Sequence, residues 1–148
     1  MLYLLLILSI FILEWKIKNY MDATYDDSRE DKILKNKIRL HKYHNHGAFL
    51  NLMEKKKKLL HLISVVFTLA VLIFFIFTLF FKGNRILKLG LSLLLGGAFS
   101  NTYDRLSRDY VVDYFSFCTP FKKLNQVVFN ISDFCIIVGS LLVVLKTS

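Results

Sequence analysis

Proline and cysteine are scarce in this chain, which has one proline and two cysteines among 148 residues. Two cysteines are too few for a disulfide framework, and Cys118 and Cys135 lack the spacing of a metal site. We therefore expect two free thiols that serve as small apolar side chains. The sequence also lacks a phosphate-binding loop, a dinucleotide motif and a serine nucleophile motif, which excludes the enzyme classes that depend on them.

Apolar residues, in contrast, are abundant and gather in four stretches. Hydrophobic residues make up 55% of the chain, with 14 phenylalanines, and the mean hydropathy is +0.47. A soluble domain of this size seldom has such a composition, so a membrane protein is indicated. In lipid, backbone groups are satisfied only in helices or closed barrels. We predict a mainly α membrane protein, a four-transmembrane-helix bundle in a single domain (residues 1–148), with spans at about 1–20, 59–81, 86–103 and 127–145.

The first and third stretches carry further signals. The first has no basic n-region and no small-residue cleavage site after it, so we interpret it as a span rather than a secretory signal. The third contains Gly90, Gly96 and Gly97. Small residues let a neighbouring helix approach closely, so we expect tight helix packing there.

The basic residues lie between the apolar stretches and give a formal net charge of +9. This placement favours contact with membrane lipids, and the four lysines at residues 55–58 are expected to meet phospholipid headgroups; we expect no nucleic-acid partner. Lysine and arginine are most frequent in the long first link, so their count alone favours a cytoplasmic first and third link. The short second link, residues 82–88, has basic but no acidic residues and favours the opposite orientation.

Two aspartates lie within apolar sequence and are candidate reactive groups. Asp133, in "FNISDFCII", follows Asn130 by three residues, which places both on one helix face. Either Asn130 caps this helix while Asp133 complements its dipole, or Asp133 is a functional carboxylate at the membrane edge. Asp113, in "YVVDYFSF", is either part of an interfacial aromatic belt or a partly desolvated carboxylate. Two such carboxylates can share one proton, so that one acts as a base toward water and the other as an acid.

The remaining polar clusters have structural interpretations. Asp104 follows the third stretch, where a carboxylate opposes the helix dipole and needs a partner. Arg105 is expected to supply part of that role, with Asn101 one turn earlier, so the group is interpreted as a polar clamp. The histidines of "HKYHNH", residues 41–46, have no acidic or cysteine ligand close by in the sequence, so a solvated or interfacial cluster is favoured over a metal site.

Four ordered motifs resemble those of the signal peptidase II family, the lipoprotein signal peptidases. "NHGAF", from residue 45, resembles the family's Asn-x-Gly-Ala-Ala-Phe, and "GGAFSNTYDR", from residue 96, resembles Gly-Gly-Ala-x-x-Asn-x-x-Asp-Arg. "VVDYFSF", from residue 111, resembles Val-Val-Asp-Phe-x-x-Phe, and "FNISD", from residue 129, resembles Phe-Asn-x-Ala-Asp. The motifs occur in order across most of the chain, and together they are highly specific.

The resemblance implies an aspartyl endopeptidase whose catalytic dyad is Asp113 and Asp133. It would cleave diacylglyceryl prolipoproteins just before the lipidated cysteine, without a metal or other cofactor, as a monomer. It would be a multi-pass protein of the bacterial cytoplasmic membrane, with cytoplasmic termini and an active site toward the outer leaflet. A small extracytoplasmic β-containing platform would form in the first link, with strand near residues 30–50. The residues implied to bind substrate or shape the site are Asn45, Gly47, Asn101, Asp104, Arg105 and Asn130.

The sequence departs from the family pattern at a few positions. The family's first span ends with Asp-x-x-x-Lys, whereas here Glu14 and Lys18 hold that spacing and are expected to form a structural pair. Ser132 replaces an alanine, and no Trp-Pro pair precedes the Phe-Asn motif. None of these departures removes a dyad carboxylate. The alternative function is a catalytically weak or inactive relative that binds lipopeptides in the membrane.

Overall fold

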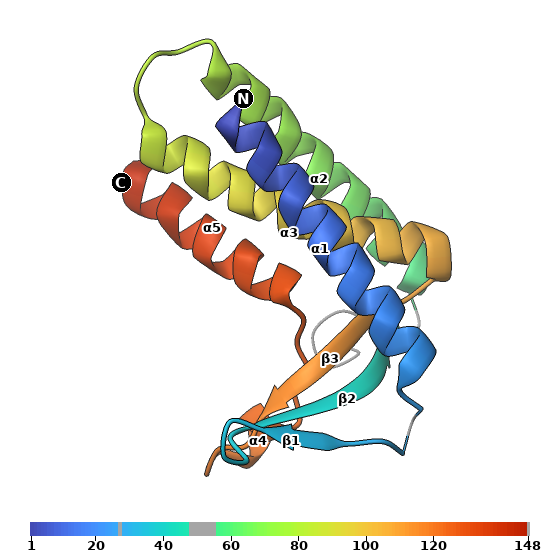
Figure 1. The fold of residues 1–148 in the computed structure, drawn as a ribbon. Coiled ribbons are helices and arrows are strands. Elements are labelled where there is room, and N and C mark those ends of the chain that lie inside the picture. Colours follow the sequence, from blue (N-terminus) through green and yellow to red (C-terminus); the bar gives the residue numbers. More distant parts are fainter. Residues whose placement is uncertain (27, 48–55, 148) are drawn as a thin grey trace.

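The structure, a computed structural model, describes residues 1–26, 28–47 and 56–147, which form a mainly helical protein with one small sheet (Figure 1). Both chain ends lie at one end of the helices, and the sheet lies at the other (Figure 1). The elements in chain order are α1 (Leu2–Thr24), β1 (Asp31–Ile33), β2 (Ile38–Asn45), α2 (Lys57–Leu79), α3 (Arg85–Arg108), β3 (Val111–Phe117), α4 (Lys122–Asn125) and α5 (Ile131–Thr147).

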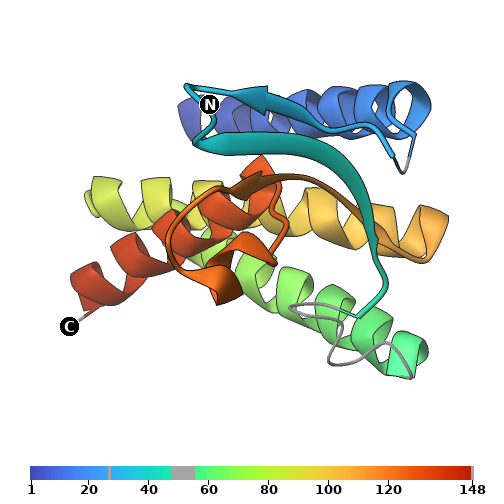
Figure 2. The ribbon, with the colours of Figure 1, turned by 90° about the horizontal axis from the view of Figure 1, so that it is seen from below.

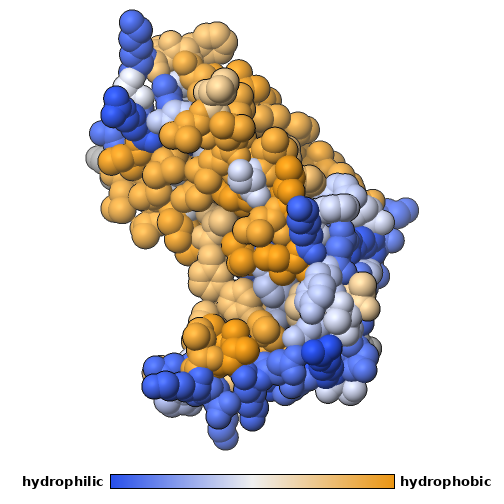
Figure 3. Space-filling model, in the orientation of Figure 1, coloured by the Kyte–Doolittle hydropathy of each residue, from blue (hydrophilic) through white to orange (hydrophobic). Residues whose placement is uncertain are grey.

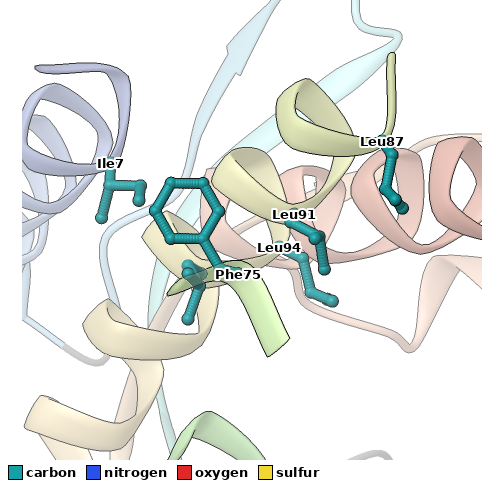
Figure 4. Close-up of a cluster of buried hydrophobic side chains, with 6 residues drawn as sticks. Ile7, Phe75, Leu87, Leu91 and Leu94 are labelled. Carbon is teal, nitrogen blue, oxygen red and sulfur yellow. The ribbon is translucent and has the colours of Figure 1, made fainter. Parts of the chain in front are cut away.

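Helix α3 is the central helix and contacts α1, α2 and α5. Its Leu91 and Leu95 are almost completely buried. They pack in one cluster with Ile7 of α1 and Phe75 of α2 (Figure 4). The many van der Waals contacts of this cluster hold three helices together.

The contact between α3 and α5 depends on glycine in both helices. A Cβ atom on Gly139 of α5 would lie 2.6 Å from the carbonyl oxygen of Gly90. A Cβ atom on Gly97 of α3 would overlap the carbonyl oxygen of Ser132. The close helix approach predicted for the glycines of the third stretch is therefore confirmed, and it places the second half of α3 beside the first turn of α5.

The four apolar stretches correspond in place to α1, α2, α3 and α5, but the helices differ in character. Among the described residues, α2 is the only helix that is both long enough and apolar enough, by length and composition, to cross a membrane. Helices α1 and α3 carry several charged residues, and α5 has 17 residues. Large apolar side chains nevertheless cover much of the visible helical surface, whereas hydrophilic residues gather around the sheet (Figure 3).

The strand expected near residues 30–50 is confirmed by β1 and β2, which form an antiparallel hairpin. Strand β2 also pairs with β3, so the order is β1-β2-β3. Tyr43 of β2 lies opposite Asp113 of β3, beyond an irregularity in the register. Seen from the sheet side, β2 and β3 curve across the ends of the helices (Figure 2). This pairing brings the end of β2, with Asn45, next to the strand that carries Asp113.

The segment before α5 is attached to β3. Phe129 donates to the Phe115 carbonyl at 2.7 Å and accepts from the Phe115 N–H at 3.0 Å. The rings of Phe115, Phe117, Phe129 and Phe134 pack together, with centroids 5.6 to 6.2 Å apart. Because residue 129 is held in a strand-like bridge, α5 begins at Ile131 and not at the predicted position 127.

Candidate active site

Asn130 and Asp133 cap the first turn of α5 reciprocally. The Asp133 N–H donates to Oδ1 of Asn130, and the Asn130 N–H donates to Oδ2 of Asp133, each at 3.0 Å. The free N–H groups at a helix start need such acceptors, and a negative charge there is stabilised by the helix dipole. The predicted cap is therefore confirmed, and it fixes one carboxylate oxygen of Asp133. The other oxygen accepts from Nδ2 of Asn101 at 3.0 Å.

Asp113 lies on β3, is 2% exposed, and accepts hydrogen bonds from two asparagine amides. Nδ2 of Asn130 donates to Oδ1 of Asp113 at 2.6 Å, and Nδ2 of Asn45 donates to Oδ2 at 2.9 Å. Asn45 reaches Asp113 from the neighbouring strand β2, whereas Asn130 reaches it from the start of α5. Strand pairing and helix capping thus aim two amides at one carboxylate.

The "NHGAF" motif is described as far as Gly47. The Gly47 N–H donates to Oδ1 of Asn45 at 3.2 Å, which turns the Asn45 amide nitrogen toward Asp113. Ala48 and Phe49, which complete the motif, lie outside the described residues, as does Lys55 of the basic run.

The structure brings the two dyad candidates into one cavity of about 400 Å³. Asn130 connects them, because it contacts Asp133 through its backbone N–H and side-chain oxygen and Asp113 through its side-chain nitrogen. The cavity has both polar and apolar lining residues. Its further lining residues include the polar Asn45, Asn101 and Arg105 and the apolar Val111, Val127, Phe129, Ile136 and Ile137.

The surroundings of Asp113 favour its protonated form. Burial, and then the nearby charge of Asp133, raise the pKa of Asp113 from the ordinary 3.8 to about 7, although the hydrogen bonds from Asn45 and Asn130 lower it. Two close carboxylates resist double ionisation, so the pair can share one proton near neutral pH. The helix start stabilises negative charge on Asp133. One protonated and one ionised carboxyl group is the combination that general acid–base chemistry uses.

Behind the dyad, Lys18 of α1 fixes the amide of Asn101. The fully buried Lys18 ammonium donates to Oδ1 of Asn101 at 2.8 Å, so Nδ2 of Asn101 faces Asp133. The same ammonium lies 3.1 Å from Asp104 and 3.7 Å from Glu14. Buried charge needs such compensation. Glu14 and Lys18 thus form the expected pair across one turn of α1.

Asp104 is a structural clamp, as predicted, but with different partners. Besides Lys18, it contacts Nε of Arg108 at 3.3 Å and accepts from the Val112 N–H at 3.2 Å. The expectation that Arg105 would be its cationic partner is wrong, because Arg105 turns into the dyad cavity. The Asp104 carboxylate therefore ties the end of α3 to the start of β3 and does not line the cavity.

Arg105 lines the cavity and is held against the helix that carries Asn101. Its Nη1 atom donates to the carbonyl oxygen of Asn101 at 3.3 Å. Its buried Nε atom has no hydrogen-bond partner among the described residues. A buried N–H group without a partner is costly and therefore unusual in a folded protein.

Two residues that the sequence did not single out as site residues, Tyr114 and Ser132, contact Glu14. The Tyr114 hydroxyl donates to Oε1 of Glu14 at 2.6 Å, and the Ser132 hydroxyl donates to Oε2 at 2.8 Å. Tyr114 directly follows Asp113 and Ser132 directly precedes Asp133. This adjacency is the one feature of the sequence that could have pointed to them. Their partner in α1 lies about a hundred residues away in the sequence, so spacing could not reveal the contact.

Two of the histidines form side-chain contacts outside the cavity, and neither cysteine is in a disulfide. His44 contacts Asp22 at 2.7 Å, and His41 contacts Ser116 at 3.1 Å. Within residues 1–26, 28–47 and 56–147, no group of His, Cys, Asp and Glu is arranged to hold a metal ion. The two cysteines are free thiols.

Comparison with known proteins gives one consistent result. The family model described as "Signal peptidase (SPase) II" matches residues 6–148. The chain is 34% identical over 142 residues to a lipoprotein signal peptidase of Lactobacillus johnsonii, covering 96% of this chain and 88% of the relative. It is 29% identical over 143 residues to that of Lactiplantibacillus plantarum, covering 97% and 91%.

Solved structures share the fold. A bacterial membrane enzyme determined by the in meso method at 2.3 Å resolution superposes with a TM-score of 0.84 at 22% identity, covering 98% of this chain and 86% of that one. A second, determined at 1.9 Å resolution, superposes with a TM-score of 0.81 at 21% identity, covering 98% and 91%.

Proposed function

Since the chain belongs to the signal peptidase II family, we propose that it is an aspartyl endopeptidase that removes signal peptides from diacylglyceryl prolipoproteins. Cleavage falls just before the lipidated cysteine. Asp113 and Asp133 are the catalytic dyad. The observation that carries the proposal is that both carboxylates line one cavity and that a single asparagine, Asn130, contacts both.

In the proposed reaction, ionised Asp133 takes a proton from a water molecule, whose oxygen attacks the scissile carbonyl carbon. Protonated Asp113 then gives its proton to the leaving amine nitrogen as the C–N bond breaks. The assignment follows from the surroundings: the start of α5 stabilises negative charge on Asp133, whereas burial and the Asp133 charge raise the pKa of Asp113 to about 7. The proton gained by Asp133 returns to Asp113 within the pair, and the reaction uses carboxylates and water without a metal or cofactor.

The remaining site residues hold this arrangement or meet the substrate. Asn45 and Asn130 aim amides at Asp113, and Asn101 aims one at Asp133. Arg105 is the substrate-binding residue of this proposal, because it lines the cavity and carries a positive charge that interacts with Asp113 and Asp133. Gly47 orients Asn45 through its backbone N–H, and the clamp residue Asp104 supports the site from outside the cavity.

We further propose that α1, α2, α3 and α5 all cross the bacterial cytoplasmic membrane. The charged residues inside α1 and α3 that weaken their apolar character include Glu14, Lys18 and Asp104, and these are buried against one another. Charged groups in membrane helices usually face the protein interior in this way. In this proposal the termini are cytoplasmic, and the dyad faces the outer leaflet together with the sheet, which lies at the end of the helices opposite to both termini (Figure 1). The protein is proposed to act as a monomer among membrane lipids.

The test is cleavage of a diacylglyceryl prolipoprotein by the purified chain in detergent, read as a mobility shift of the substrate on a gel. Asp113→Asn and Asp133→Asn are each expected to abolish the shift. Asp109→Asn is the matched control with wild-type cleavage, because Asp109 is an exposed residue at the end of α3, outside the cavity. Full cleavage by either dyad variant would refute the dyad, and a wild type that binds the substrate without cleaving it would favour the inactive-relative alternative.

A further inference from the structure

We propose that Glu14, Tyr114 and Ser132 form a positioning network that sets the first turn of α5, and therefore Asp133, against α1 and β3. The inference rests on the proposed function, because it assigns residues that hold the catalytic base in place. All three lie outside the residues that line the dyad cavity, so they act through Asp133.

The carboxylate of Glu14 is the centre of the network. Its Oε1 atom accepts from the Tyr114 hydroxyl at 2.6 Å. Its Oε2 atom accepts from both the N–H and the hydroxyl of Ser132, at 3.1 and 2.8 Å. Lys18 is more distant, at 3.7 Å from Oε2. The shortest contacts of Glu14 therefore run to β3 and α5 and not along its own helix.

The network satisfies the N–H groups at the start of α5. A helix leaves its first N–H groups without intrahelical partners. The Ile131 N–H donates to the Tyr114 hydroxyl at 3.1 Å, and the Ser132 N–H donates to Glu14. The Asp133 N–H donates to Asn130. Two of these three N–H groups thus have their acceptors on β3 and α1, so the position of the first turn of α5 depends on those two elements.

Because these contacts are buried, the loss of one is expected to be costly for the groups that remain. Glu14 and Ser132 are 0% exposed, and Tyr114 is 5% exposed. Hydrogen bonds to a charged group in such surroundings are stronger than in water, and a donor left without its acceptor is costly. Burial and the Glu14 charge also raise the pKa of Tyr114, so its hydroxyl remains a donor near neutral pH.

The hydroxyls of Tyr114 and Ser132 both donate to the single carboxylate of Glu14, one to each oxygen. We expect such a set to behave as a unit, in which a change at one residue weakens the contacts of the others.

The experiment measures kcat and KM for prolipoprotein cleavage by Ser132→Ala, Glu14→Asp and the double variant, at a temperature below unfolding of each. Each single change is expected to lower kcat about tenfold at an unchanged KM, because one hydrogen bond to a buried charge is lost. The double variant is expected to be no slower than the slower single variant.

Ser92→Ala is the matched control. It also removes a fully buried serine hydroxyl, one that donates to the Lys88 carbonyl within α3 at 2.7 Å, so it should leave kcat unchanged. If the double variant shows the product of the two single effects, the residues act independently and the network is refuted. A wild type without cleavage refutes the proposed function and the network with it, whereas multiplicative variants of a cleaving wild type refute the network alone.

Discussion

The Lys18 ammonium lies 2.8 Å from Oδ1 of Asn101, and this hydrogen bond decides which end of the Asn101 amide faces Asp133. A carbonyl oxygen turned toward a carboxylate would be repelled, whereas the amide nitrogen donates to it. Lys18 lies in α1 and is not among the residues that line the cavity, yet it orients an amide that donates to the proposed catalytic base.

Replacement of Lys18 by methionine is expected to lower the free energy of unfolding by about 3–5 kcal/mol, because a buried charge cluster loses its cation. Glu14 and Asp104 would then be buried carboxylates without the ammonium that lies between them. Thermal unfolding in detergent measures the loss. Lys16→Met, at an exposed position of the same helix, is the control, and equal unfolding temperatures for both variants would contradict the assigned role.

Asn130 has a capping role and a second role at Asp113, and substitution can separate them. Serine is a good helix cap but has no amide to reach Asp113. Asn130→Ser is therefore expected to unfold near the wild-type temperature while kcat falls about tenfold or more through the lost hydrogen bond to a carboxylate. Asn130→Ala should lose the cap as well, at about 1 kcal/mol. Unfolding curves and initial rates on the same preparations check this, and an active Asn130→Ser enzyme would count against the amide contact.

Features that depend on nearby residues could be predicted from the sequence. The spacing of Asn130 and Asp133 predicted the cap, since both partners lie within one helical turn. Glycines predicted that a neighbouring helix would approach α3 closely, and the structure identifies α5 as a helix that does so. The contact of Glu14 with Ser132 joins residues 118 positions apart, so only the folded chain reveals it. The family motifs paired the two dyad candidates, for which spacing alone left a structural and a functional interpretation open.

The start of α5 and the partner of Asp104 show why local patterns fail. Apolar sequence from residue 127 predicted helix, but Phe129 forms backbone hydrogen bonds with β3 instead. Arg105 follows Asp104 directly, and neighbours in a helix point in different directions. The cations that reach Asp104 are Arg108, one turn later, and Lys18 from another helix.

Activity is expected to fall as the pH rises through about 7, because in the proposed reaction Asp113 gives a proton to the leaving amine and its pKa is raised to about 7. Initial rates measured across neutral pH give this falling limb of the pH–rate profile. Its apparent pKa is a property of the coupled pair Asp113 and Asp133. Asn45 donates to the ionised form, so Asn45→Ala should move the limb to higher pH. A limb that stays in place or moves to lower pH would contradict this contact.

The free energy of unfolding should also depend on the protonation of Asp113. Between the ordinary pKa of 3.8 and the folded value of about 7, the folded chain binds more protons at Asp113 than the unfolded chain does. The contribution of Asp113 to the free energy of unfolding therefore declines as pH rises through this window. Asp113→Asn removes the decline, so its unfolding temperature relative to wild type should increase from about pH 5 to about pH 8. The exposed Asp109→Asn should show no such trend, and a constant difference for Asp113→Asn would refute the buried, raised-pKa state.

Disturbing the close contact of α3 and α5 should lower kcat more than an equal loss of stability elsewhere in the protein. A Cβ atom at Gly97 would overlap the Ser132 carbonyl, so Gly97→Ala must push the first turn of α5 away from α3. Overpacking of this kind costs about 1–3 kcal/mol. Gly83→Ala is the control: Gly83 has a φ of +88° and open space around it, so alanine there is strained without touching the site. Because Asn101 and Asp133 face each other across the same helix pair, we expect kcat to fall only for Gly97→Ala when rates are compared below both unfolding temperatures. Equal rates in the two variants would mean that Asp133 keeps its position when the helices separate.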